Sequence, residues 1–390
     1  MDYLANIAPI FGSQMMFHNN LFLTILLVIF ILSAITQLFY YLYYYLSPGI
    51  YKVPAVSLSK EPVSVIICAR NEEENLKNFL PAIMEQDYPY FEVIVVNDCS
   101  DDDSYFVLGE YLKKYPNLHI SNVSKDPKFT HNKKFAQFIG IKAARNELML
   151  FTDADCRPES SKWIENMVSH FSDKTDFVLG YGGFFKGKGL LNKYIRYDSM
   201  VIAMQYFGMA IRGIPYMGVG RNLAYRRSLF FRNKGFGSHN YLASGDDDLF
   251  VNSNASKANT ALEFEKEAHT RSVPAPNLKD FIKQKKRHMT TAKHYKGRDQ
   301  TILVAEPASR ILFYASFVVL LSFLYLWPVV LAVFAFRMLI QLLVINIVQE
   351  RFNERGLMPW IVIFDVLSPF INSLIYIKSQ RQHAGKYQWK

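Results

Sequence analysis

The chain has 390 residues, of which 50% are hydrophobic and 20% charged, and its formal net charge is +10 at pH 7. The basic residues gather around 221–234 and 283–298, beside apolar segments, where anionic lipid headgroups and a small anionic substrate account for them as well as nucleic acid would. We therefore expect no nucleic-acid partner. The odd number of cysteines, three, argues against a disulfide framework and for reduced thiols in small buried sites.

An uncharged apolar run occupies residues 20–46 and is long enough to span a bilayer as a helix. A signal peptide would need a basic region before this run and small residues for cleavage after it, and neither is present. Residues 1–50 are therefore predicted to be a retained transmembrane anchor. Lys and Arg are absent from residues 1–19 and follow the run at Lys52 and Lys60, so the positive-inside rule predicts a cytoplasmic domain at the plasma membrane.

Strand and helix patterns alternate in the next region, residues 51–275. Val63–Ala69 and Glu92–Asp98 are apolar, β-branched runs that are typical of buried strands. A helix is expected at Asn132–Ala144, before a third strand that ends near Asp153. This order predicts an α/β domain with a mainly parallel sheet covered by helices on both faces. Ligands of such sheets bind at the carboxyl ends of the strands.

Polar and acidic side chains stand at the end of each predicted strand. Arg70 and Glu72 follow the first strand, and Asp98 ends the second. Asp153 and Asp155 end the third, as part of the sequence T-D-A-D. Mg²⁺ and Mn²⁺ prefer oxygen ligands and share them with substrate phosphates. A single Asp at a strand end often serves only a turn or a helix cap, but three such ends at one edge favour a nucleotide site with Mg²⁺ or Mn²⁺.

Three adjacent carboxylates, Asp246, Asp247 and Asp248, follow the small residues Ser244 and Gly245. Buried acids that lie side by side repel each other, so one of them is expected to keep a raised pKa and to accept a proton near neutral pH. A helix N-cap with acidic residues in the first turn is the alternative interpretation of this triplet.

A basic segment and two apolar blocks complete the chain. Segment 276–305 alternates apolar and basic residues in the way that is typical of a helix lying at a membrane surface. Residues 306–378 are predicted to form transmembrane helices. Their first block, 311–348, is broken at Trp327-Pro328 and predicts a hairpin of two helices.

The last apolar block, 357–377, is interrupted by Asp365 and Pro369 and is expected to form a re-entrant pair of half-helices covered by protein. That arrangement would keep the basic tail, 379–390, in the cytoplasm. Asp365 and Arg337 are costly in lipid, so both are expected to face protein or a water-filled path, as a packing ion pair or in a functional role.

Four segments occur in an order that resembles glycosyltransferase family 2: V-S-V-I-I-C-A-R-N-E-E, V-I-V-V-N-D-C-S-D-D, N-K-K-F-A and L-F-T-D-A-D-C. The likeness covers roughly residues 60–290. Members of this family are inverting enzymes of the GT-A fold, a Rossmann-like fold with a mainly parallel sheet, and they use nucleotide-diphosphate sugars. The resemblance implies the same fold and the same class of donor for this chain.

The resemblance also implies roles for the strand ends. The donor-binding residues would be Ala69, Arg70, Glu72, Asp98, Lys133 and Asp153. Glu72 and Asp98 would hold the base and the ribose, because a carboxylate accepts hydrogen bonds from a base N–H or a ribose hydroxyl. Lys133 would lie near the phosphates; a solvated helix face is the alternative for Lys133 and Lys134.

Asp155 is implied as the direct metal ligand, and Asp153 would be shared between the metal and the ribose. The metal would neutralise charge that grows on the leaving diphosphate. In the family an Asp removes the proton from the acceptor hydroxyl, and that catalytic residue maps to Asp247, with Asp246 as the other choice. His269 would either complete the metal shell or lie at the surface.

Two further segments resemble motifs on the acceptor side of the family. A glycine turn at 218–221 would present Asn222 to the acceptor. Gln284, Arg287 and His288 take the positions of the Q-x-x-R-W motif of membrane-bound, often processive members, with His288 in place of the Trp. The lost Trp argues against polysaccharide synthesis, and a purely interfacial role is the alternative for this segment.

The sequence thus predicts a multi-pass membrane enzyme that inverts configuration as it moves a sugar from a nucleotide-diphosphate sugar to an acceptor hydroxyl. The acceptor would be lipid-linked or a glycan, reached at the cytoplasmic face among membrane lipids. A processive polysaccharide synthase is the alternative within the enzyme class. A non-catalytic membrane protein that binds nucleotide-sugar is the alternative outside it, and the intact Asp153, Asp155 and Asp247 argue against that reading.

Overall fold

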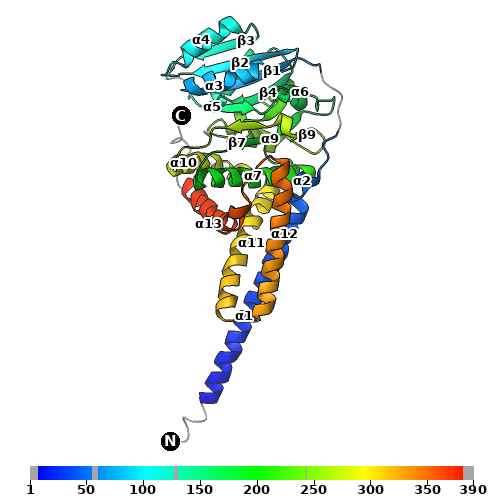
Figure 1. Ribbon diagram of the computed structural model, residues 1–390, viewed down its shortest axis with the longest axis vertical. Coiled ribbons are helices and arrows are strands. Elements are labelled where there is room, and N and C mark those ends of the chain that lie inside the picture. Colours follow the sequence, from blue (N-terminus) through cyan, green and yellow to red (C-terminus); the bar gives the residue numbers. More distant parts are fainter. Residues whose placement is uncertain (1–7, 55–59, 127–130, 243, 381–390) are drawn as a thin grey trace.

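Long helices and an α/β body occupy opposite ends of the molecule (Figure 1). The computed structural model describes residues 8–54, 60–126, 131–242 and 244–380. The α/β class and the long apolar helices at both ends of the chain agree with the predicted fold class.

The sheet of the body has seven strands in the order β3-β2-β1-β4-β8-β6-β9. These strands are β1 (Val63–Ala69), β2 (Phe91–Asp98), β3 (Leu118–Val123), β4 (Leu148–Asp153), β6 (Phe177–Gly180), β8 (Leu223–Arg226) and β9 (Thr260–Glu263). The first four run parallel, whereas β8 is antiparallel to both β4 and β6. The predicted mainly parallel sheet is therefore confirmed.

Helices cover both faces of this sheet. Successive side chains of a strand point to opposite sides, so an apolar strand needs a covering layer on each side. The covering helices are α3 (Glu73–Met84), α4 (Ser104–Lys114), α5 (Lys133–Ala143) and α6 (Trp163–Val168). Val65 and Ile67 of β1 pack with apolar residues of α3, α4 and α6. Ile66 and Cys68 point to the other side and pack with α5. Every residue of β1 is buried, which explains its uninterrupted apolar sequence.

A second, small sheet has the strand order β5-β10-β7, formed by β5 (Cys156–Pro158), β10 (Thr270–Ser272) and β7 (Gly182–Phe184). Strand β5 begins directly after Asp155, whose carbonyl oxygen accepts a hydrogen bond from Val273 N at 3.1 Å. The small sheet therefore fixes the chain on the far side of the D-A-D sequence. Two short helices, α8 (Arg227–Arg232) and α9 (Asp248–Asn254), complete the body.

Three helices lie between the sheet and the long helices: α7 (Leu190–Ile211), α10 (Leu278–Met289) and α13 (Ile361–Gln380) (Figure 1). Lys285 of α10 forms a buried ion pair with Asp198 of α7. Gln380 of α13 donates to Met289 O of α10 at 3.2 Å. We call these three helices the platform, because they join the α/β body to the stalk described next.

The stalk consists of α1 (Ala8–Phe39), α11 (Gly297–Ser322) and α12 (Trp327–Arg351). Phe30 stacks on Phe313 at 4.9 Å between ring centroids, and Phe317 stacks on Phe334 at 4.1 Å. The hairpin between α11 and α12 lies where the sequence predicted a break, because Pro328 suits the first turn of a helix, which needs no N–H donor there. Counting α13, four helices of the described chain are long and apolar enough to cross a membrane.

A π-helical turn, Tyr40–Tyr45, and the short helix α2 (Ser47–Ile50) connect α1 to the body. Tyr40, Tyr41, Tyr44 and Tyr45 are all buried. The turn therefore directs two pairs of tyrosines into the protein, where they pack against α7 and α12.

The last apolar segment differs from the prediction of two half-helices. Residues Ile361–Gln380 form one continuous helix that includes Pro369. Asp365, which suggested an interruption, lies fully buried against the stalk, where Arg337 Nη1 is 2.7 Å and Arg310 Nη1 is 3.1 Å from its carboxylate. The expectation that Asp365 and Arg337 face protein is therefore confirmed. Ion pairs with two other helices hold Asp365 inside a continuous helix, at the position where the sequence pattern indicated a break.

Candidate active site

The parallel strands β1, β2 and β4 end at the same edge of the sheet. Ala69 pairs with Asn97, and Cys68 pairs with Asp153, so the three strand ends lie side by side. Asn71 adopts a positive φ of 54°, and its side chain accepts from Asp101 N at 2.7 Å. This bond ties the turn after β1 to the turn after β2.

Two of the predicted donor-binding carboxylates lie in these turns. Asp98 is fully buried, and its Oδ1 lies 2.9 Å from His131 Nδ1. Its Oδ2 has no hydrogen-bond partner among the described residues. Glu72 is 7% exposed and accepts from Asn75 Nδ2 at 2.5 Å. No sequence pattern indicated the contact between His131 and Asp98, because His131 lies 32 positions after Cys99, the residue that follows Asp98.

Lys133 connects the strand ends to the acidic triplet. Its Nζ lies 2.7 Å from Asp153 Oδ1 and 3.3 Å from Asp246 Oδ2. Lys134, the next residue, is 1% exposed and donates to His239 O at 2.6 Å. The alternative of a solvated helix face is therefore wrong for both lysines. Lys133 bridges two carboxylates, and Lys134 holds the loop that leads to Asp246.

Asp247 caps α9 and accepts two backbone hydrogen bonds. Gly220 N donates to its Oδ2 at 2.6 Å and Asp248 N to its Oδ1 at 2.8 Å. Burial, then repulsion from Asp246 and Asp248, raises the pKa of Asp247 from 3.8 to about 7. The cap that the sequence offered as an alternative is thus present, together with a carboxyl group that titrates near neutral pH.

The two neighbours of Asp247 differ from it. Burial would raise the pKa of Asp246, but the nearby Lys133 and Arg287 cations outweigh that effect and lower it. Asp248 accepts hydrogen bonds from the hydroxyls of Thr291 and Tyr295, the latter at 2.6 Å. Asp248 therefore anchors the segment between α10 and α11, whereas Asp246 is a paired carboxylate.

The residues of the D-A-D sequence fit a divalent cation. One ligand atom from each of Asp153, Asp155 and Cys156 lies within 4.8 Å of the others. Burial and the Asp155 carboxylate raise the pKa of the Cys156 thiol well above its usual value, and its Sγ lies 2.7 Å from Ser272 Oγ. The Cys156 side chain is fully buried and is already in contact with Ser272. The two carboxylates are therefore the ligands on offer, and they suit Mg²⁺ or Mn²⁺.

Helix α10 brings its basic residues to the same region. Desolvation by nearby protein atoms, followed by the Arg287, Arg221 and Lys133 cations, lowers the pKa of His288 well below its usual value, although the residue is exposed to solvent. Arg287 Nη2 lies 3.2 Å from His288 Nε2. Gln284 lies half-buried on the same helix. Arg221 was missed in the sequence, although it stands beside the predicted Asn222.

Two predicted residues lie elsewhere than expected. Asn222 is fully buried; its amide donates to Tyr181 O and Ala268 O, both at 2.8 Å, and accepts from Trp163 Nε1 at 2.9 Å. It supports the core instead of facing an acceptor. His269 is also fully buried, with Nε2 at 2.9 Å from Phe264 O, so the prediction of a surface histidine is wrong.

Asp153 at a strand end and Asp246 in the acidic loop face each other across Lys133. This arrangement is expected of a sugar-transferring enzyme with the GT-A fold. Comparison with known proteins supplies the family. The sequence matches Glycosyl transferase family 2 over residues 64–231 and Glycosyl transferase family group 2 over residues 151–374. The chain therefore belongs to glycosyltransferase family 2, which confirms the resemblance noted in its motifs.

Similar proteins agree with this family. Glycosyltransferase AglE of Haloferax volcanii is 34% identical over 112 residues, which are 28% of this chain and 35% of that protein. Probable glycosyltransferase YdaM of Bacillus subtilis is 29% identical over 176 residues, 43% of this chain and 41% of that protein. The matches thus span less than half of each relative. The mannosyltransferase PcManGT of Pyrobaculum calidifontis, solved with GDP-Man and Mn²⁺, shares the fold, with a TM-score of 0.57, 17% identity and coverage of 89% of this chain and 98% of that one.

Proposed function

We propose that this glycosyltransferase moves a sugar from a nucleotide-diphosphate sugar to the hydroxyl of a lipid-linked or glycan acceptor, with inversion at the anomeric carbon. One observation carries the proposal: Lys133 bridges Asp153 at a strand end and Asp246 in the acidic loop, beside a carboxyl group whose pKa is about 7. A donor-phosphate site and a proton acceptor therefore adjoin each other.

Asp247 is the proposed general base. A carboxylate with a pKa near 7 is ionised in a substantial fraction of molecules at neutral pH and still binds a proton well, which is the compromise that general-base catalysis needs. The bonds from Gly220 N and Asp248 N fix its orientation. Asp246 is less suited, because its pairing with Lys133 lowers its pKa and so its basicity.

The donor would lie across the strand ends. Asp98 offers a buried carboxylate oxygen that has no hydrogen-bond partner in the described part of the chain, which suits a base N–H or a ribose hydroxyl. Asp153 and Asp155 would hold Mg²⁺ or Mn²⁺, and the ion, when bound, supplies positive charge that stabilises the leaving diphosphate. Lys133 places a second positive charge beside Asp153, where it can contact the same phosphates.

The platform is the proposed meeting point with the membrane. On α13, Leu367, Phe370 and Leu374 are exposed and recur at spacings of three and four, which forms one apolar stripe. The opposite face of α13 packs on α7, α10 and α11. We therefore place α13 flat on the membrane, with α1, α11 and α12 spanning it. Three spans leave both the catalytic body and the end of α13 on one side, which the positive-inside rule makes cytoplasmic; the basic tail after Gln380 lies outside the described residues.

The processive alternative receives less support. The rings of Phe30, Phe313, Phe317 and Phe334 contact one another between the three stalk helices, on the route that a polymer would have to take through the stalk. A single or non-processive transfer at the membrane surface needs no such passage. Gln284, Arg287 and His288, on the platform helix α10, are the residues we assign to the acceptor.

Donor hydrolysis tests this function. The purified protein in detergent is incubated with a panel of nucleotide-diphosphate sugars, with Mn²⁺ or Mg²⁺, and release of the nucleoside diphosphate is measured. We expect release that depends on the metal and is lost in Asp155→Asn but kept in Asp173→Asn, which changes an exposed carboxylate. Release that survives both Asp155→Asn and Asp153→Asn would contradict the assignment of the metal site, and binding without release from any donor would favour the non-catalytic alternative.

A further inference from the structure

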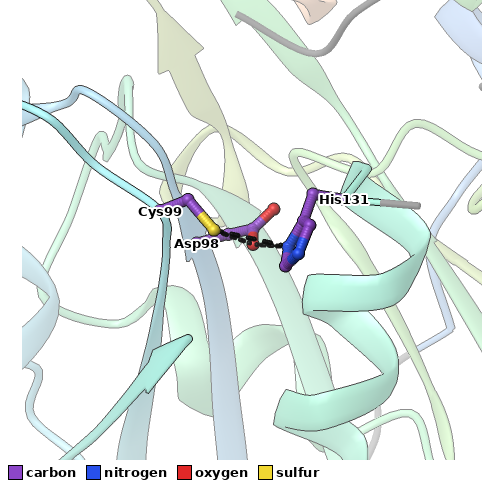
Figure 2. A group of neighbouring side chains, drawn as sticks. All are labelled: Asp98, Cys99 and His131. Carbon is purple, nitrogen blue, oxygen red and sulfur yellow. Dashed lines mark hydrogen bonds and ion pairs between the residues drawn. The ribbon is translucent and has the colours of Figure 1, made fainter. Parts of the chain in front are cut away.

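Asp98, Cys99 and His131 form a second group of metal-ligating side chains, on the opposite side of β1 from the D-A-D sequence. One atom from each lies within 4.8 Å of the other two. Figure 2 shows the Cys99 sulfur and the His131 ring facing each other beside the Asp98 carboxylate. Asp98 ends β2, Cys99 follows it, and His131 lies two residues before α5. Only the fold therefore brings the three residues together.

The separations fit one face of a tetrahedral zinc site. Cys99 Sγ lies 3.3 Å from His131 Nδ1 and 3.4 Å from Asp98 Oδ1, and the latter two atoms are 2.9 Å apart. Tetrahedral Zn²⁺ with bonds of about 2.3 Å to sulfur and about 2.0–2.1 Å to nitrogen and oxygen places such atoms about 3.3–3.6 Å from one another. A small outward movement, about 0.4 Å at the longest adjustment, therefore admits the ion.

The surroundings also suit a bound metal. The backbone of Asp126 offers a donor and an acceptor to His131 Nε2. The Asp126 N–H group lies 3.0 Å away and the Asp126 carbonyl oxygen 3.2 Å away. The ring can therefore keep its proton on Nδ1 for Asp98, or carry it on Nε2 and donate to the Asp126 carbonyl while Nδ1 binds a metal. A ligating histidine is normally held in that second way. The buried Oδ2 of Asp98 has no hydrogen-bond partner among the described residues, so it can serve as a second oxygen contact to the ion.

The ligand set separates this group from the proposed Mg²⁺ or Mn²⁺ site. Sulfur and imidazole nitrogen select Zn²⁺, whereas carboxylates alone suit harder ions. Cys99 and His131 are only partly buried, so water can supply the fourth ligand. We propose that Asp98, Cys99 and His131 bind Zn²⁺, and that the bound ion blocks the donor by occupying the Asp98 carboxylate. The blocking effect rests on the proposed donor role of Asp98, whereas the metal binding does not.

Metal binding is tested on the full chain in detergent, freed of metal by a chelator. Zn²⁺ affinity is measured by competition with a chromophoric chelator, and Co²⁺ is added as a spectroscopic probe for thiolate ligation. We expect one Zn²⁺ per chain and a thiolate-to-cobalt charge-transfer band. Cys99→Ala should abolish the band, and His131→Ala should weaken Zn²⁺ binding by more than the roughly 10–100-fold that loss of a secondary partner costs.

The other two cysteines provide matched controls. Cys68→Ala removes a buried thiol from β1 and should leave the band unchanged. A band that is lost in Cys156→Ala and kept in Cys99→Ala would overturn the proposal, because the ion would then lie at the D-A-D sequence. Absence of the band in the wild type, with every variant folded by its melting curve, would overturn it as well.

A second measurement separates the zinc site from the proposed function. Binding of UDP and GDP with Mg²⁺ is measured before and after one equivalent of Zn²⁺. We expect Zn²⁺ to weaken nucleotide binding at least tenfold in the wild type and not in Cys99→Ala. Nucleotide binding that is unaffected by Zn²⁺ bound through Cys99 overturns the blocking effect. If neither nucleotide binds under any condition while the cobalt band is present, the donor assignment fails and the zinc site stands.

Discussion

Replacement of Asp247 by Asn should lower activity and raise stability, and both effects should depend on pH. The carboxyl group is held at a pKa of about 7 instead of its ordinary 3.8, because the fold removes most of it from water beside Asp246 and Asp248. A folded-state pKa above the unfolded value means that the wild type loses stability as the pH rises from about 4 to about 7. Asn cannot ionise and avoids that loss.

The size of the effect follows from the same shift. A rise from 3.8 to about 7 corresponds to roughly 4 kcal/mol, at about 1.4 kcal/mol per pH unit. Asn keeps one acceptor oxygen for the bonds from Gly220 N and Asp248 N, so one of the two is lost at a cost of about 1 kcal/mol. After solvent screening at this partly exposed carboxyl group, a net gain on the order of 2 kcal/mol is expected above pH 7.

Two assays on Asp247→Asn check this reasoning. Melting temperatures in detergent should differ little near pH 4, then diverge in favour of the variant up to pH 7 and stay apart above it by about 4 °C. Sugar transfer should fall by about 10²–10⁴-fold at pH 8, and the wild-type rate should rise tenfold per pH unit below about 7. Asp173→Asn, on the surface, is the control. A melting difference that does not change with pH, or a variant as active as the wild type at pH 8, would refute the assignment of Asp247 as base.

Two further predictions concern buried charges. Lys133→Gln removes a cation that lowers the pKa of Asp247, so the acidic limb of the pH–rate profile should move to higher pH. An unmoved midpoint of this limb in the hydrolysis assay would show that Lys133 does not act on the base. Glu354→Gln should destabilise the protein by about 3 kcal/mol in detergent melting experiments, because Glu354 is fully buried and pairs with Arg196 at 2.7 Å and with Arg271. Glu350→Gln, which breaks an exposed pair with Arg355, should cost less than about 1 kcal/mol, and equal effects of the two substitutions would contradict the burial argument.

Much of the fold could be predicted because its signals are local. An uninterrupted apolar strand such as Val63–Ala69 indicates a sheet covered on both faces, and the break at Trp327-Pro328 indicates a hairpin. The acids at Asp98, Asp153 and Asp155 stand at strand ends, and parallel strands bring such ends to one edge. For these features the residue pattern and the tertiary contact carry the same information.

The last apolar segment shows where local signals fail. Asp365 and Pro369 break the apolar pattern, and a break in lipid would be costly. The actual helix is continuous, because Arg310 and Arg337 approach Asp365 from two other helices and compensate its charge. A single segment cannot reveal partners that lie 28 and 55 residues away.

Short-range patterns predicted the family, the alternation of strands and helices, the apolar ends of the chain and the acids at the strand ends. The differences in pKa among the acidic groups of the site arise from tertiary contacts alone. Lys133 reaches Asp246 from a distant part of the chain, which lowers the pKa of that acid and leaves Asp247 beside it near neutrality. Burial and charge at a site depend on everything that packs around it, and the phosphate-binding role that we propose for Asp153 and Asp155 depends on that packing as well.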